Sequence, residues 1–199
     1  MNNIIIKFIV TGFWFGLIPA APGTFGSLVA FPIFYGLLFL LFLIGPKIDI
    51  PGLLPIMQEI ITIWILLIIF LMIVIFTGTY LVGLYLQNNA SKDPKEVVID
   101  EIAGQILTLI LTLPYSIFSY AFFQEGYVSL NYYLFLYYFL LPFLLFRLMD
   151  IIKPWPIYYI DQKMTGAVAV MLDDLLAALF AACLFYAIAP ILTEYLSAK

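Results

Sequence analysis

The chain has 199 residues, of which 65% are hydrophobic and only 10% are charged, and its mean hydropathy is +1.14. These values leave too few polar side chains to cover a water-soluble globule of this length, so the composition predicts an integral membrane protein. The net charge is −4 and the eight lysines and arginines are scattered along the chain. This distribution argues against nucleic acid as a partner and against a polybasic lipid anchor.

Long uncharged stretches separate the charged residues, and each can hold a membrane-spanning helix of roughly 20 residues. An apolar segment at 4–18, predicted to lie in the interface or to re-enter the membrane, is followed by predicted spans at 26–44, 60–86, 97–123, 130–149 and 167–190. Pro114 and Pro142 fall inside apolar runs and are expected to kink or divide their helices. The sequence shows no repeat and no linker, so it predicts a single all-α membrane domain over residues 1–199, with about four to five transmembrane helices.

The positive residues indicate how these helices cross the membrane. One set of helix ends carries six of them, namely Lys7, Lys92, Lys95, Arg147, Lys153 and Lys163. The opposite set carries only Lys47 and Lys199. Because cytoplasmic loops are enriched in lysine and arginine, the first set of ends is predicted to face the cytosol.

The first chemically distinctive stretch is APGTFGS, which opens the first long span. Gly23 and Gly26 allow backbone amides to approach a ligand, and Thr24 and Ser27 add hydroxyl groups. The N-terminal dipole of the following helix would then favour an anion at this position. An ordinary turn followed by a helix cap would have a similar sequence. Beside the other polar segments of the cytosolic end, we interpret the stretch as a phosphate-binding element.

The stretch RLMDIIKP places Arg147, Asp150 and Lys153 at intervals of three residues, before Pro154 ends the helix. The three side chains share one helix face as long as the helix lasts. One interpretation is an intrahelical ladder of ion pairs, worth a few tenths of a kcal/mol. We favour the other interpretation, in which the arginine binds a phosphate as a bidentate fork and the lysine acts as a point charge.

The stretch MLDDLLAAL sets Asp173 and Asp174 in an apolar run with no cation within a helical turn. On the predicted topology they share one membrane depth with the other charged residues at the cytosolic helix ends, namely Asp100, Glu101, Arg147, Asp150, Lys153 and Asp161. Ionisable residues there cost about 2.5–3.5 kcal/mol each on insertion and usually mark a functional interior. A divalent cation would make the carboxylates tolerable. With no histidine and only one cysteine, in an apolar run, the available oxygen ligands favour Mg²⁺ over zinc.

Missing residue types narrow the chemistry further. The absence of histidine excludes a phosphohistidine intermediate and a histidine base, and the chain has neither a DxDxT nor a DGxxAR motif. Metal-assisted chemistry remains, in which carboxylates hold Mg²⁺ for the activation of water and the neutralisation of phosphoryl charge.

Three segments, GLIPAAPGTFGSLVAFPIFY, KDPKEVVIDEIAGQ and FRLMDIIKPWPIYYIDQKMTGAVAVMLDD, resemble the phosphatidylglycerophosphatase A family. Its members are membrane enzymes that remove the terminal phosphate from phosphatidylglycerophosphate to give phosphatidylglycerol. The resemblance implies an all-helical fold, dependence on Mg²⁺ and a bacterial inner membrane. The family's PGTxGS, DExxG, RxxDxxKPxPI and MxDD elements fall on Pro22, Gly23, Thr24, Gly26 and Ser27, on Asp100, Glu101 and Gly104, on Arg147, Asp150, Lys153, Pro154, Pro156 and Ile157, and on Met171, Asp173 and Asp174.

The residues and the resemblance together predict a cytosol-facing, Mg²⁺-dependent phosphatase that acts on phosphatidylglycerophosphate. The expected catalytic carboxylates include four metal ligands, Glu101, Asp150, Asp173 and Asp174, and also Asp100, as a further ligand or as the base that orients water. The groups expected to hold the substrate phosphate are Arg147, Lys153, Gly23, Thr24 and Ser27.

Two alternatives stay open on the sequence alone. The first is a small cation or metabolite carrier that uses the buried carboxylates, although the crowding of polar motifs at one end of the helices speaks against it. The second is a Mg²⁺-dependent transferase that acts on another lipid or polyprenyl phosphate.

Overall fold

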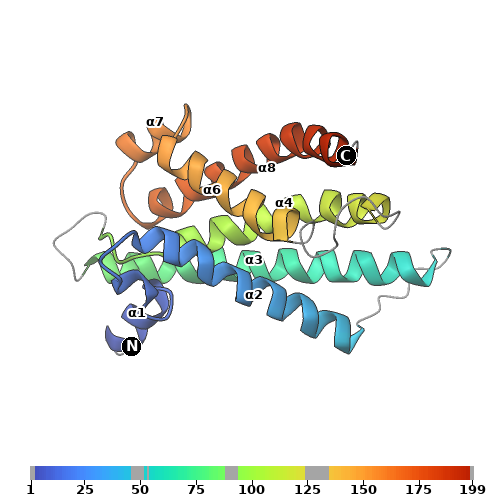
Figure 1. Ribbon diagram of the computed structural model, residues 1–199. Coiled ribbons are helices and arrows are strands. Elements are labelled where there is room, and N and C mark those ends of the chain that lie inside the picture. Colours follow the sequence, from blue (N-terminus) through green and yellow to red (C-terminus); the bar gives the residue numbers. More distant parts are fainter. Residues whose placement is uncertain (1–2, 46–51, 53, 88–93, 124–134, 198–199) are drawn as a thin grey trace.

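The computed structural model describes residues 3–45, 52, 54–87, 94–123 and 135–197, which form helices joined by short connections and contain no strand (Figure 1). The all-α prediction is confirmed. In chain order the elements are α1 (Asn3–Val10), the 3₁₀ turn η1 (Phe15–Leu17), α2 (Pro22–Ile44), α3 (Pro55–Gln87), α4 (Ile99–Phe123), the π-helical segment η2 (Phe135–Leu140), α6 (Leu141–Ile152), α7 (Ile157–Lys163) and α8 (Ala167–Ser197).

Four of these helical stretches are long and apolar enough to cross a membrane, which agrees with the predicted four to five. They are Pro22–Ile44, Pro55–Gln87, Phe135–Ile152 and Ala167–Leu196. The predicted span at 97–123 is the single helix α4, and within the described residues it is not one of the four. The first turn of α4 contains Asp100 and Glu101. The start of the span predicted at 130–149, and Lys47, Lys92 and Lys199, lie outside the described residues.

The apolar N-terminal segment does not cross the membrane as one helix. With only eight residues, α1 is too short to span a bilayer. It packs on the end of α3 through Ile6 and Val10, which share a buried cluster with Leu81 and Val82. The Val98 amide donates a hydrogen bond of 2.9 Å to the Val10 carbonyl, so α1 also holds the segment that leads into α4.

Local sequence explains where the helices begin, continue and end. Gly45 and Lys153 terminate α2 and α6 in the left-handed conformation, and Pro154 prevents α6 from continuing. Pro142 lies in the first turn of α6, where the π-helical segment changes to α-helix. Pro114, by contrast, does not divide α4, which continues beyond it.

Small residues and aromatic rings build the interior. Four alanines of α8 are buried and pack with Phe146 and Phe185, namely Ala177, Ala178, Ala181 and Ala189. Small residues allow the close helix approach that is typical of membrane bundles. Large apolar side chains such as Phe42 and Ile73 are exposed on the outer faces, where a bilayer would cover them.

The polar groups gather at one end of the bundle. The N-terminal ends of α2, α4 and α8 meet there with the C-terminal ends of α3 and α6 and with α7, whereas the C-terminus lies at the opposite end (Figure 1). This convergence brings together segments separated by up to 150 residues along the chain.

Candidate active site

A pocket of about 540 Å³ opens at the polar end of the bundle. Its lining comes from the start of α2, the chain before α4, the first turn of α4, the end of α6, α7 and the start of α8. Eight of the ten residues predicted for the site line it, namely Gly23, Asp100, Glu101, Arg147, Asp150, Lys153, Asp173 and Asp174. Thr24 and Ser27 are not among the lining residues.

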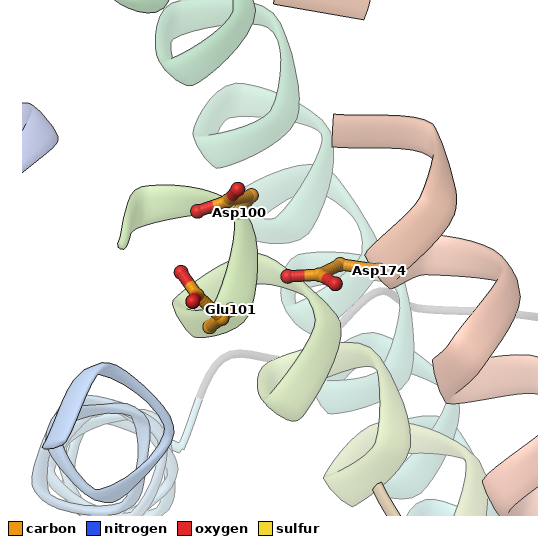
Figure 2. Close-up of side chains that lie close together, drawn as sticks. All are labelled: Asp100, Glu101 and Asp174. Carbon is orange, nitrogen blue, oxygen red and sulfur yellow. The ribbon is translucent and has the colours of Figure 1, made fainter. Parts of the chain in front are cut away.

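Three carboxylates form the centre of the site (Figure 2). Asp100 and Glu101 come from the first turn of α4 and Asp174 from the second turn of α8, and one oxygen of each lies within 4.8 Å of the others. Asp100 is 9% exposed and Asp174 only 4% exposed. Within the described part of the chain, each of the three has one buried oxygen without a hydrogen-bond partner, Oδ1, Oε2 and Oδ2 respectively. We call these three residues the carboxylate triad.

Gly104 allows α4 and α8 to approach closely enough for the triad to form. A Cβ atom on this residue would lie 2.9 Å from the carbonyl oxygen of Asp174 and 2.7 Å from two ring atoms of Phe146. Neither neighbour has room to move, since one is backbone and the other is a fully buried ring. The glycine of the DExxG element therefore has a packing role one turn below the carboxylates.

Gly23 has a similar role where the start of α2 meets the site. A Cβ atom here would lie 2.3 Å from Oε1 of Glu101 and 3.1 Å from both terminal nitrogens of Arg147. The missing side chain thus leaves space for a carboxylate and a guanidinium beside the first turn of α2. In the predicted phosphate-binding element, Gly23 supplies this close approach.

Arg147 is held at the site by groups from two helices. Its Nη1 atom forms an ion pair of 2.6 Å with Oδ2 of Asp150, one turn along α6, and donates a longer hydrogen bond of 3.5 Å to Oγ of Ser27. The Ser27 hydroxyl itself donates to the Gly23 carbonyl at 2.9 Å. Asp150 also lies close enough to Asp174 to interact with it electrostatically. Ser27 therefore orients the guanidinium from outside the pocket.

Lys153 does not continue the face of Arg147 and Asp150, because α6 ends at Ile152 and the lysine backbone turns into the left-handed region. Its ammonium group donates hydrogen bonds of 2.5 Å to Asp161 and 2.7 Å to Asp173. Burial lowers the pKa of Lys153, but these two carboxylates outweigh the effect and hold the pKa above its ordinary value. Lys153 therefore stays charged and joins α6, α7 and α8. The intrahelical ladder is limited to Arg147 and Asp150.

The donor set suits a hard divalent cation. The triad supplies oxygen atoms alone, three of which are buried without a partner, and a buried carboxylate without a partner is costly. Cations such as Mg²⁺ prefer ligands of this kind. Arg147 stands beside the triad at Gly23, so an anion bound to the cation would also meet the guanidinium.

Sequence comparison assigns this arrangement to a family. The family model described as Phosphatidylglycerophosphatase A matches residues 8–189. The chain belongs to this family. The resemblance seen in the sequence is confirmed, and membership makes the chain a phosphatase, that is, a hydrolase of phosphoric monoesters.

Relatives with curated names match most of the chain. The phosphatidylglycerophosphatase A of Escherichia coli strain K12 is 29% identical over 178 residues, which cover 89% of this chain and 80% of the relative. The Haemophilus influenzae protein of the same name is 31% identical over 183 residues, covering 92% and 88%. A Bacteroides thetaiotaomicron protein named "Putative phosphatidylinositol-3-phosphatase" is 31% identical over 170 residues, covering 85% and 84%. No solved structure matches the chain.

The structure divides the predicted metal ligands into two groups. Glu101 and Asp174 belong to the triad, together with Asp100, whereas Asp150 and Asp173 each pair with a cation of the chain. Of the predicted phosphate-binding groups, Arg147, Lys153 and Gly23 line the pocket and Ser27 supports the arginine. The Thr24 amide closes the first turn of α2 by a 3.0 Å hydrogen bond to the Ala21 carbonyl.

Two further residues were not among those predicted for the site, one inside the pocket lining and one outside it. Asp161 of α7 lines the pocket and pairs with Lys153, but no sequence spacing relates α7 to α6 or α8. Gln105 of α4 is fully buried, and neither its Oε1 nor its Nε2 has a hydrogen-bond partner in the described part of the chain. An amide four residues after Glu101, on the same helix face, was the available signal for Gln105.

Proposed function

We propose that the protein is a Mg²⁺-dependent phosphatase that converts phosphatidylglycerophosphate to phosphatidylglycerol and phosphate, with its site facing the cytosol in a bacterial inner membrane. The observation that carries the proposal is the carboxylate triad beside Arg147, with three buried oxygen atoms that have no hydrogen-bond partner among the residues described. The substrate is inferred from the names of the Escherichia coli and Haemophilus influenzae relatives.

Asp100, Glu101 and Asp174 would hold the Mg²⁺ ion, with Asp150 bordering them through its interaction with Asp174. When bound, the ion would supply Lewis-acid stabilisation of phosphoryl oxygens and lower the pKa of a bound water. This assignment differs from the ligand set predicted from the sequence. Asp173 instead neutralises Lys153, and Asp150 orients Arg147.

The remaining groups would position the phosphate for attack by water. Asp150 and Ser27 both hold Arg147 through Nη1. Its other guanidinium nitrogens would therefore be available to donate hydrogen bonds to two phosphate oxygens. Lys153 adds a positive charge to the pocket lining from the C-terminal end of α6. In the reaction the water oxygen forms a bond to phosphorus, the bond between phosphorus and the glycerol oxygen breaks, and that oxygen gains a proton.

The charged helix ends support the proposed orientation. Among the described residues, Lys7, Lys95, Arg147, Lys153 and Lys163 all belong to segments at the end of the bundle that carries the site. The positive-inside rule favours the cytosol for that end. A headgroup in the inner leaflet would then reach the pocket while its acyl chains stay in the bilayer.

The carrier alternative is not favoured. Within the described residues, the triad and both ion-paired cations lie at one end of the bundle, whereas a carrier would need ionisable groups near the midplane. The Bacteroides thetaiotaomicron relative presents a more specific alternative, because its name refers to a phosphoinositide at similar identity. The substrate therefore has to be tested among several lipid phosphates.

The deciding experiment measures phosphate release by the purified protein from phosphatidylglycerophosphate, phosphatidylinositol 3-phosphate and phosphatidic acid. We expect phosphatidylglycerophosphate to be hydrolysed fastest, EDTA to abolish release, and added Mg²⁺ to restore it. Full activity in EDTA would contradict the metal assignment. Faster hydrolysis of either other lipid would contradict the substrate assignment and leave the phosphatase itself intact.

A further inference from the structure

The connection between α6 and α8, next to the pocket, carries exposed aromatic side chains. Trp155 is 79% exposed, Tyr158 59% and Tyr159 56%. None of the three lines the pocket. We call them the aromatic lip.

The lip continues a surface that belongs to the bilayer. On α6, Leu144, Leu148 and Ile151 are exposed at helical spacing, and α6 ends one of the spans that can cross a membrane. Beyond Ile152 the exposed aliphatic side chains give way to tryptophan and tyrosine. This change is typical of the boundary between the acyl chains and the headgroups, where amphipathic rings are enriched.

The connection between α6 and α8, which carries the aromatic lip, also forms a wall of the pocket. Asp161 and Gln162 of α7 line it, as do Met164 and Thr165 just after the helix. The segment is held firmly, because Ile157 is fully buried in the cluster shared by α6 and α8 and because Asp161 pairs with Lys153. The position of the aromatic lip relative to the pocket is therefore fixed by the fold.

From this juxtaposition we propose that the aromatic lip lies in the headgroup layer of the leaflet on the pocket's side, and that lipid headgroups enter the pocket across it without leaving the bilayer. The partner of this surface is the lipid interface itself. The inference rests on the proposed function for its substrate. It adds the route by which that substrate arrives.

Fluorescence tests where the lip lies. In a variant with Trp14→Phe and Trp64→Phe, Trp155 is the only tryptophan of the chain. In lipid vesicles, we expect its emission to be quenched more strongly by lipids brominated near the headgroup than by lipids brominated near the chain ends or by iodide in the water. Strong quenching by iodide, with no effect of brominated lipids, would overturn the proposal.

Kinetics test what the lip does. For Tyr158→Ser with Tyr159→Ser, we expect the apparent KM for long-chain phosphatidylglycerophosphate in vesicles to rise about tenfold, equivalent to about 1.4 kcal/mol. The kcat, and the KM for a short-chain soluble form of the substrate, should not change. Tyr195→Ser is the matched control, because Tyr195 is 58% exposed at the opposite end of α8.

The two proposals fail in different ways. Suppose that the wild-type protein hydrolyses both substrate forms and that the tyrosine variant shows the same loss of activity on both. The tyrosines then act on the pocket, and the lip proposal is wrong. Equal kinetics of variant and wild type on vesicles would also overturn it. If the wild-type protein hydrolyses neither form, the proposed function fails, and Trp155 quenching still decides where the lip lies.

Discussion

Asp173 and Asp174 are adjacent on α8, yet their carboxylates face different partners. Asp173 accepts a 2.7 Å hydrogen bond from Lys153, whereas Asp174 joins Asp100 and Glu101 in the carboxylate triad. Neighbouring residues on a helix point about 100° apart, so one pair of aspartates serves two sides of the pocket. Asp173 neutralises a cation of the chain through one oxygen, whereas Asp174 forms no ion pair within the described residues and lies in the cluster of carboxylates.

This difference predicts unequal effects of two matched substitutions. Asp174→Asn should reduce kcat by about 10³-fold, because loss of a proposed Mg²⁺ ligand would remove several kcal/mol of charge stabilisation and each 1.36 kcal/mol is tenfold. Asp173→Asn should reduce it by only about 10–100-fold, as is usual for a residue that orients others at a metal site. Phosphate release from phosphatidylglycerophosphate measures both.

Measuring Mg²⁺ binding distinguishes a residue that coordinates the metal from one with a structural role. Mg²⁺ should raise the melting temperature of the wild-type protein and of Asp173→Asn, because an ion that binds the folded state stabilises it. It should have little effect on Asp174→Asn. Equal thermal shifts in the two variants would show that the triad is assigned wrongly.

Much of this arrangement could be predicted from the sequence, and the reasons are local. Uncharged runs of sufficient length predicted the spans, and charges confined to their ends predicted one polar end for the bundle. That Asp173 and Asp174 point in different directions follows from their adjacent positions on a helix. Which of them pairs with a cation of the chain could not be predicted, because this depends on the left-handed turn at Lys153 that ends α6. The ion pair between Asp161 and Lys153 could not be predicted either, since it depends on how α7 folds back.

Gly23 provides a test of the close contact between α2 and the site. Gly23→Ala would place a Cβ atom 2.3 Å from the Glu101 carboxylate, so we expect Glu101 to be displaced and kcat to fall at least about tenfold, the effect of 1.4 kcal/mol. The variant should remain folded, since alanine favours a helix over glycine by roughly 0.5–1 kcal/mol.

Gly36→Ala is the control on the same helix, because a Cβ atom there would meet nothing within 4 Å. It should leave activity unchanged and leave the melting temperature equal or slightly higher. If both alanine variants retained full activity, the space at Gly23 would have no role in the site.

Lys153 is expected to serve phosphate binding and to hold α7. Lys153→Met should raise KM about tenfold, the effect of 1.4 kcal/mol, and should increase protease sensitivity around residues 157–166, because Asp161 and Asp173 lose their shared partner. Lys163→Met, which removes an exposed lysine that does not line the pocket, should change neither. A normal KM with a loosened α7 would limit Lys153 to a structural role.

The buried side-chain amide of Gln105 is the feature that most needs an explanation in terms of a bound ligand. Its side-chain amide is fully buried, lies one turn after Glu101 and has no hydrogen-bond partner at either atom among residues 3–45, 52, 54–87, 94–123 and 135–197. An unsatisfied buried amide costs about 1–3 kcal/mol, so Gln105→Leu should leave the melting temperature unchanged or raise it. If the amide supports Glu101 or Arg147 when substrate and Mg²⁺ are bound, kcat should fall about 10–100-fold, as for other groups that orient metal ligands.

Thr112→Val is the control, because Thr112 is buried on the same face and its hydroxyl donates only within α4. It should leave kcat unchanged, whereas an unchanged kcat in Gln105→Leu would make Gln105 a tolerated defect of packing.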